Sequence, residues 1–129
     1  KWHGSSVAFG DIDDDGDVDI IMTTLNGPVR VFRNDAPKRT WLAVELLGSP
    51  GNPRGLGSRV ELVTPSGVQR RWITGGGSYQ SVDSTLANFG LGALKDTSGV
   101  RLKVRWPDGK MTEHPVNSLS SRIRLRQSD

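Results

Sequence analysis

Apolar and polar residues alternate along this chain in a way that predicts short β-strands. Apolar and cationic side chains alternate at a period of two over residues 100–106 and again over 122–126. That pattern is typical of a strand with one buried and one solvated face. No stretch has the 3.6-residue period of an amphipathic helix. The apolar runs predict strands over residues 7–10, 20–24, 29–33, 41–46, 59–63, 68–73, 100–106, 110–114 and 122–126.

Turn-forming residues separate these runs and indicate how the strands connect. Asn26-Gly27 predicts a tight hairpin, and Thr64-Pro65-Ser66-Gly67 predicts a second one with proline at the second turn position. Many short strands and no helix place the chain in the all-β class, as an antiparallel β-sandwich or a partly open barrel. A break in the pattern near Pro37 divides the chain into two predicted domains, residues 1–36 and 37–129.

Composition adds a contrast between these two parts. The 129 residues carry a net charge of +3, but residues 1–35 hold three bases against seven acids and the remainder holds fourteen bases against seven acids. Such asymmetry usually marks separate tasks. The absence of cysteine excludes a disulfide framework, and no apolar stretch is long enough to span a membrane. Because the sequence opens on Lys1-Trp2-His3, we expect it to be a piece of a longer protein.

One acidic loop carries the clearest chemistry. Acids stand at positions one, three, five and nine of the segment 11–19, with glycine at position six. Such a loop can surround a hard divalent cation with oxygen ligands. The predicted calcium ligands are the side chains of Asp11, Asp13, Asp15 and Asp19 and the backbone carbonyl of Asp17. The flanking strands and Met22 at position twelve exclude an EF-hand, whose twelfth residue is a bidentate glutamate. Two alternatives stay open: a catalytic carboxylate pair and a solvated acidic turn.

The same segment resembles a known repeat. Phe9-Gly10, then D-x-D-x-D-G-x-x-D, then an apolar strand is similar to the FG-GAP, or VCBS, repeat. This resemblance covers residues 1–35 and implies a propeller-blade-like β-hairpin segment with a calcium loop. It also implies that further blades of the same protein lie upstream, since a propeller needs several.

The rest of the chain resembles the ASPIC/UnbV domain, which commonly follows such repeats. The resemblance is carried by G-N-P-R-G-L-G-S-R-V over 51–60, by G-G-G-S-Y-Q-S over 75–81, and by F-G-L-G over 89–92 with V-R-W-P-D-G over 104–109. Asn88 stands where the family often has histidine, and Ser78 stands where a glycine is usual. The family implies a secreted, surface or periplasmic protein, and it is also named after a protein linked to enediyne biosynthesis.

Read physically, those glycine-rich strings indicate architecture. Gly75 to Gly77 lack the following Gly-Lys-Ser/Thr of a phosphate loop, so a bulge or a close backbone approach is the better interpretation. His3 and His114 are the only histidines, which leaves little for a zinc site or a catalytic triad. Trp41, Trp72 and Trp106 are in period with apolar neighbours and are predicted to pack in the core, whereas Trp2 is predicted to be exposed.

Two strands present rows of cations. If they were neighbours, they would form one patch for an acidic polysaccharide or an acidic protein; otherwise they are solvated outer faces. Because no aromatic residues interleave with these cations, nucleic acid is not an expected partner. The residues are Arg101, Lys103 and Arg105 in one strand and Arg122, Arg124 and Arg126 in the other.

These observations favour a non-enzymatic, calcium-binding β module of an extracellular, cell-surface or periplasmic protein that serves adhesion or ligand binding. The alternative is an accessory or catalytic domain in secondary-metabolite biosynthesis of the enediyne type, which the family name alone suggests. That alternative would require a cleft with convergent reactive groups, such as a buried acid and an arginine beside Tyr79.

Overall fold

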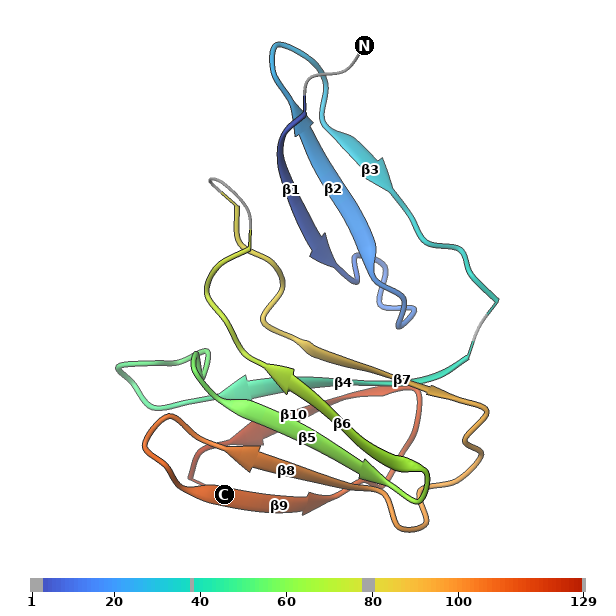
Figure 1. The fold of residues 1–129 in the computed structure, drawn as a ribbon, viewed down its shortest axis with the longest axis vertical. Helices are drawn as coiled ribbons and strands as arrows, with labels where there is room; N and C mark the ends of the chain where they lie inside the picture. The colour runs from blue at the N-terminus through green and yellow to red at the C-terminus, as the bar shows by residue number, and fades with distance from the viewer. Residues whose placement is uncertain (1–3, 38, 78–80, 129) are drawn as a thin grey trace. The chain divides into compact units, whose positions relative to one another are not determined.

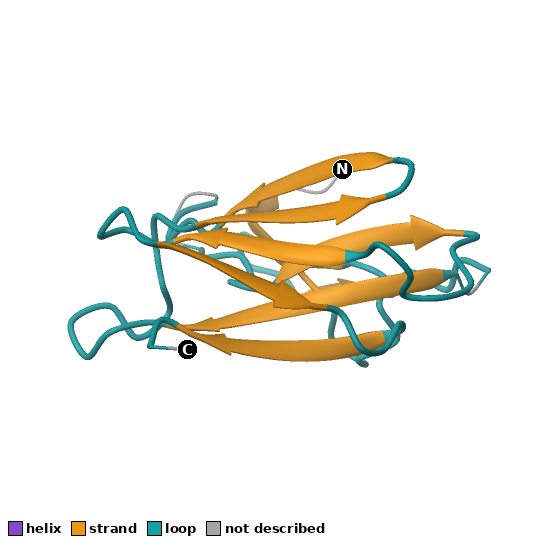
Figure 2. Ribbon diagram, turned by 90° about the horizontal axis from the view of Figure 1, so that it is seen from below, coloured by secondary structure: helices purple, strands orange, loops and turns teal. Residues whose placement is uncertain are grey.

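The structure is a computed structural model that describes residues 4–37, 39–77 and 81–128. The expectations for Trp2, His3, Ser78 and Tyr79 lie outside the described residues. All regular secondary structure in the described residues is β (Figure 2). Among these residues, no helix is long and apolar enough to cross a membrane.

The chain divides into two compact units. Unit 1 comprises residues 1–38 together with 75–84, and unit 2 comprises residues 39–74 together with 85–129. The segment 75–84 therefore interrupts unit 2 in sequence but belongs to unit 1. The sequence pattern did not predict that this segment belongs to unit 1, because the segment is rich in glycine and serine and has no strand-like alternation.

Unit 1 contains a small antiparallel sheet. Its strands are β1 (Gly4–Gly10), β2 (Asp19–Thr24) and β3 (Arg30–Phe32), in the order β1-β2-β3 (Figure 1). The predicted hairpin at Asn26-Gly27 is confirmed: Asn26 adopts a left-handed φ of 56° between β2 and β3. Asparagine tolerates that conformation better than most residues do.

Residues 81–84 lie along the free edge of β1. The backbone N–H of Phe9 donates to Asp83 Oδ1 at 3.0 Å, and the N–H of Ser84 donates to the carbonyl of Phe9 at 3.0 Å. The hydroxyl of Ser81 donates to the carbonyl of Val7 at 2.6 Å. A Cβ on Gly77 would collide with the Asp83 carboxylate. The predicted close approach in this glycine run is therefore confirmed at Gly77, and the segment satisfies backbone groups that an edge strand would leave unpaired.

Unit 2 is built from two sheets that are not closed into a barrel (Figure 1), as expected for the predicted β-sandwich. One sheet has the order β10-β4-β7 and the other β6-β5-β8-β9. Their strands are β4 (Thr40–Leu47), β5 (Arg59–Thr64), β6 (Gly67–Trp72), β7 (Ala87–Gly92), β8 (Arg101–Arg105), β9 (Met111–Pro115) and β10 (Ser121–Arg126).

The strand pairing of unit 2 differs from the expectation in two respects. β10 runs parallel to β4, so the sandwich is not purely antiparallel. β7 was not predicted as a strand, because glycines at positions 90 and 92 remove half of its alternation. Its alternate residues Ala87 and Phe89 are nevertheless buried.

The core of unit 2 lies between the two sheets. Alternate residues of β5 and β8 point inward, and β4 is buried along most of its length. The buried cluster consists of Leu42, Val44, Leu46, Val60, Leu62, Ile73, Ala87, Phe89, Val100, Leu102, Val104, Trp106, Val116 and Leu125. At roughly 25 cal/mol per Å² of apolar surface removed from water, this cluster is the main source of stability for the unit.

Polar side chains join the two sheets at one edge. Gln69 Nε2 of β6 donates to the carbonyl of Gly90 at 2.8 Å, and Arg71 Nε donates to the carbonyl of Asn88 at 3.0 Å. The Arg71 guanidinium also lies over the Phe89 ring, 5.3 Å from its centroid. These hydrogen bonds satisfy the carbonyls of Gly90 and Asn88 on the edge of β7 that has no neighbouring strand.

The loop between β4 and β5 is held together by one amide side chain. Asn52 Nδ2 donates to the carbonyl of Leu56 at 2.8 Å, and Asn52 Oδ1 accepts the N–H of Leu56 at 2.9 Å. The N–H of Gly48 donates to the carbonyl of Pro53 at 3.0 Å and closes the loop at its base. The motif over 51–60 is therefore architectural, as its composition indicated.

We predict that Asn52→Ala destabilises unit 2 by about 2–3 kcal/mol, because two hydrogen bonds of a half-buried loop are lost and the Leu56 backbone groups lose their partner. Chemical denaturation monitored by tryptophan fluorescence measures this change. Asn117→Ala, at an exposed position, is the control and should change the free energy of unfolding by less than about 0.5 kcal/mol. Equal effects of the two variants would contradict the assignment.

Candidate functional site

The acidic loop connects β1 to β2 within unit 1. Its backbone bends sharply at two residues in the left-handed region, Asp14 with a φ of 57° and Gly16 with a φ of 94°. Glycine suits the second position because it has no Cβ to oppose a positive φ. The bend folds the loop back so that its carboxylates face one another.

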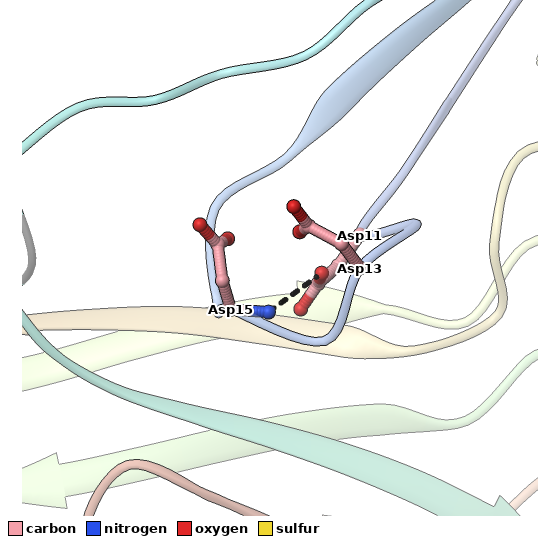
Figure 3. A group of neighbouring side chains, drawn as sticks. All are labelled: Asp11, Asp13 and Asp15. Atoms are coloured by element: carbon pink, nitrogen blue, oxygen red, sulfur yellow. Dashed lines mark hydrogen bonds between the residues drawn. The ribbon is translucent and has the colours of Figure 1, made fainter.

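Three of the four predicted side-chain ligands come together. Ligand oxygens of Asp11, Asp13 and Asp15 all lie within 4.8 Å of one another (Figure 3). Backbone N–H groups of the same loop orient two of these carboxylates. Asp11 accepts from Asp15 at 3.2 Å and from Gly16 at 2.9 Å, and Asp15 accepts from Asp17 at 2.9 Å. The side chains of Asp11 and Asp15 are thereby held in place by the loop itself.

Asp19 occupies a different environment at the end of the loop. It is fully buried, and each of its oxygens accepts a backbone N–H, from Ile12 and from Asn34, at 2.8 Å. The hydrogen bonds from Asn34 and Ile12 lower the pKa of Asp19. The side chains of Asp17 and Asp19 are not part of the three-carboxylate group. Asp19 ties the start of the loop to the segment after β3, a structural role that the sequence pattern did not indicate.

The electrostatics of the loop favour an additional positive charge. Partial burial raises the pKa of Asp11, the N–H groups of Gly16 and Asp15 oppose that rise, and the charge of Asp14 adds to it. Arg33 Nε lies 3.9 Å from Asp13 but only 2.7 Å from Asp35. The hydrogen bond with Asp35 is also the main cause of the raised pKa of Arg33. Arg33 is thus engaged mostly outside the carboxylate group.

The donor set of this group suits a hard cation. Carboxylate oxygens are the ligands that calcium prefers, and a carboxylate oxygen that accepts one N–H keeps a second lone pair for a metal. Among the described residues, the group consists of three aspartates and contains no histidine. The arrangement can bind and neutralise an ion; its geometry contains no separated acid–base pair of the kind that glycosidases use.

The two cationic strands belong to different sheets of unit 2. β8 lies in the sheet β6-β5-β8-β9 and β10 in the sheet β10-β4-β7. Arg101 and Lys103 share Glu113, at 3.2 and 3.5 Å, and Arg124 pairs with Glu45 at 2.8 Å. The six bases therefore form two separate rows rather than one sheet face, and each row contains acidic partners.

The tryptophan predictions have mixed outcomes. Trp106 is 1% exposed, which confirms a core position, and Trp41 is half-buried. Trp72 is 60% exposed, so its predicted core position was wrong. Ile73, which follows it, occupies the core with 2% exposure. The physical reason is register: Trp72 pairs with Arg59, on the face of the sheet opposite the buried Val60.

This register could have been obtained from the sequence. The Thr64–Gly67 turn sets the pairing of β5 with β6, and counting outward from it places Trp72 opposite Arg59.

The remaining histidine in the described residues, His114, is half-buried and makes a 2.9 Å hydrogen bond with the Thr112 hydroxyl. Its surroundings are those of a structural residue in β9.

We predict that the stabilising contribution of Asp19 is lost in acid. Because its pKa is lowered in the folded state, this contribution is present above the unfolded value of about 3.9 and disappears as the pH falls through the folded value. In metal-free buffer, the difference in free energy of unfolding between the wild type and Asp19→Asn should be largest above about pH 5 and should shrink below about pH 4. A difference that does not change with pH would contradict this account.

Comparison with known proteins places the chain in a family. Residues 48–129 match the family model described as ASPIC and UnbV. The chain is 35% identical over 126 residues to cartilage acidic protein 1 of Mus musculus and to that of Homo sapiens, and 34% identical over 119 residues to that of Xenopus tropicalis. These alignments cover 88–92% of this chain and 18% of each relative, so the chain spans about a fifth of their length. The chain belongs to the ASPIC and UnbV family.

Proposed function

We propose that this chain is a calcium-binding, non-enzymatic β module of an extracellular protein and that it serves adhesion or ligand binding. The observation that carries the proposal is the grouping of the Asp11, Asp13 and Asp15 oxygens within 4.8 Å in a loop braced by its own N–H groups. Such a group is repulsive by itself and is stabilised when a divalent cation is bound.

The proposed ligand set has five members. The side chains of Asp11, Asp13, Asp15 and Asp19 and the backbone carbonyl of Asp17 would hold the ion, which supplies charge neutralisation and a fixed loop conformation when bound. Asp19 is fully buried beside the loop and each of its oxygens accepts a single N–H, so lone pairs stay available on it. The ion is structural in this proposal, and no reaction step is assigned to it.

Unit 1 is proposed to be a blade-like repeat of the FG-GAP, or VCBS, type. Both faces of its sheet expose apolar side chains: Ile20 and Phe32 share one face and are 37% and 45% exposed, and Ile21 and Val31 share the other and are 37% and 60% exposed. A sheet that is apolar on both faces is typical of one stacked between other layers. Upstream blades of the same protein are the proposed neighbours.

An extracellular location suits the proposed calcium site. Extracellular modules with weak calcium sites, with dissociation constants of about 10⁻⁴–10⁻³ M, are filled where calcium is millimolar. The relatives carry the name cartilage acidic protein 1, and cartilage is a tissue that consists largely of extracellular matrix. Ligand binding is proposed for the two cationic rows of unit 2, with an acidic polysaccharide or an acidic protein as the partner class. The rows are Arg101, Lys103 and Arg105 of β8 and Arg122, Arg124 and Arg126 of β10.

We predict that calcium raises the thermal stability of unit 1. For a site of the affinity given above, a few millimolar calcium should add about 1–2 kcal/mol through preferential binding to the folded state. Scanning calorimetry of the full chain with calcium and with EDTA measures the shift in Tm. Asp13→Asn should remove the calcium-dependent part of the shift.

Asp14→Asn is the matched control, since it removes the same charge one residue away and asparagine tolerates the positive φ at that position. It should leave the calcium-dependent shift largely intact. No change of Tm with millimolar calcium, or an equal loss in both variants, would refute the proposed site.

A further inference from the structure

One face of the sheet β6-β5-β8-β9 gathers exposed apolar side chains. The term outer face is used below for one side of this sheet. It is the side that carries Arg59, Glu61 and Val63 of β5 and the residues of β6, β8 and β9 that lie in register with them. The large apolar side chains of unit 2 that are exposed in the described residues are Val68, Trp72 and Met111, at 43%, 60% and 62% exposure. All three are on the outer face, since Val68 and Trp72 pair with its β5 residues and Met111 pairs with Arg105. This concentration indicates an interaction surface.

The outer face is also positively charged. Its bases are Arg59, Arg70, Arg101, Lys103 and Arg105. Its acids are Glu61 and Glu113, so five bases stand against two acids and the face has a formal excess of three positive charges. The complementary partner is therefore an anion.

The excess charge is concentrated at one corner. Arg59 and Arg105 are directly opposite each other across β5 and β8, a like-charge pair that costs stability. Arg59 is compensated, since its Nε lies 3.1 Å from Glu61 and its guanidinium lies 5.6 Å from the centroid of the Trp72 ring. The side chain of Arg105 is exposed and has no ion-pair or hydrogen-bond partner among the described residues. A bound anion would relieve the repulsion between the two guanidinium groups.

A small, open cavity marks this corner. It has a volume of about 180 Å³ and is lined by Arg59, Trp72 and Arg105 and by the turn residues Pro107 and Gly109. A site of this size is smaller than the roughly 300–1,000 Å³ of most small-molecule pockets, so it accommodates one unit of a larger ligand. The indole of Trp72 offers a flat apolar surface beside the guanidinium groups.

We propose that this corner binds an acidic sugar unit of an anionic polysaccharide, with the sugar ring on Trp72 and its carboxylate or sulfate on Arg105 and Arg59. The C–H groups of a saturated ring carry partial positive charge and pack well on the negative face of an indole. Arginine binds carboxylate and sulfate oxygens through paired N–H donors. This inference rests on the proposed ligand-binding role and assigns that role a site and a ligand class.

Two other anionic polymers fit the corner less well. A peptide that binds by adding a strand pairs with a sheet edge, whereas Trp72, Arg59 and Arg105 project from a sheet face. Single-stranded nucleic acid is held by successive stacking aromatics, and Trp72 is the one aromatic side chain of this face.

The test is affinity chromatography and calorimetry of the full chain on hyaluronate, which carries carboxylates, and on dextran sulfate, which carries sulfates. Neutral dextran, poly-glutamate and a single-stranded DNA oligonucleotide are the comparison ligands. Trp72→Ala should lower the affinity for the preferred acidic polysaccharide at least tenfold and Arg105→Gln at least fivefold. Trp72→Phe should restore part of the loss, because it keeps an aromatic face. Arg124→Gln, which removes the same charge from the other sheet, should change affinity less than twofold.

Several outcomes would overturn the assignment. The first is that the chain is not retained on either acidic polysaccharide at low salt. The second is that it binds neutral dextran equally well, or binds poly-glutamate or DNA at least as strongly as the acidic polysaccharides. The third is that Arg105→Gln and Arg124→Gln change the affinity equally. A melting curve of each variant tests whether it is folded. Polysaccharide binding that persists in EDTA would show that this site does not depend on the proposed calcium loop. Absence of a calcium-dependent Tm shift would refute the calcium loop and leave this polysaccharide site unaffected.

Discussion

The two-residue period of a β-strand is the constraint on which both the core and the surface of unit 2 depend. Burying Val60, Leu62, Leu102 and Val104 between the sheets forces every alternate residue of the same strands to the opposite side. That side carries Arg59, Lys103 and Arg105, and through strand pairing it also carries Trp72. The cationic, aromatic outer face is thus a geometric consequence of the core, and a shift of register by one residue would destroy both.

Unit 1 is stabilised differently, because hydrogen bonds to carboxylates take the place of a large hydrophobic core. Asp19 holds the backbone of Ile12 and Asn34, Asp11 holds Asp15 and Gly16, and Asp83 holds Phe9. Hydrogen bonds to charged acceptors are stronger than those to neutral ones, which compensates for a sheet whose apolar side chains are largely exposed. The contribution of Asp83 comes from a segment that the sequence places more than seventy residues after β1, so the two units are joined by several passages of the chain.

Most strands and turns could be predicted because they depend on local pattern. The hairpins at Asn26-Gly27 and at Thr64–Gly67 are specified by turn residues, and β5 and β8 by clean alternation. β7 was missed because Gly90 and Gly92 break its alternation. Trp72 was placed in the core because it was taken to be in period with apolar neighbours, whereas the next residue, Ile73, is the buried one. For the candidate site, the spacing of acids around Gly16 was sufficient to locate the loop. It did not distinguish the grouped Asp11, Asp13 and Asp15 from the buried, hydrogen-bonded Asp19.

The sequence by itself determined the all-β class, the position of the acidic loop and the rows of cations, because each of these depends on residues close together in the chain. Tertiary structure alone decided which rows share a sheet, which bases have acidic partners and which segment covers the edge of β1. Those features depend on strand pairing between residues far apart in sequence, such as β4 with β10 and Phe9 with Asp83. Such pairings form because apolar side chains from distant strands are buried together and because backbone N–H and C=O groups need hydrogen-bond partners. Neither requirement can be recognised from a short stretch of sequence.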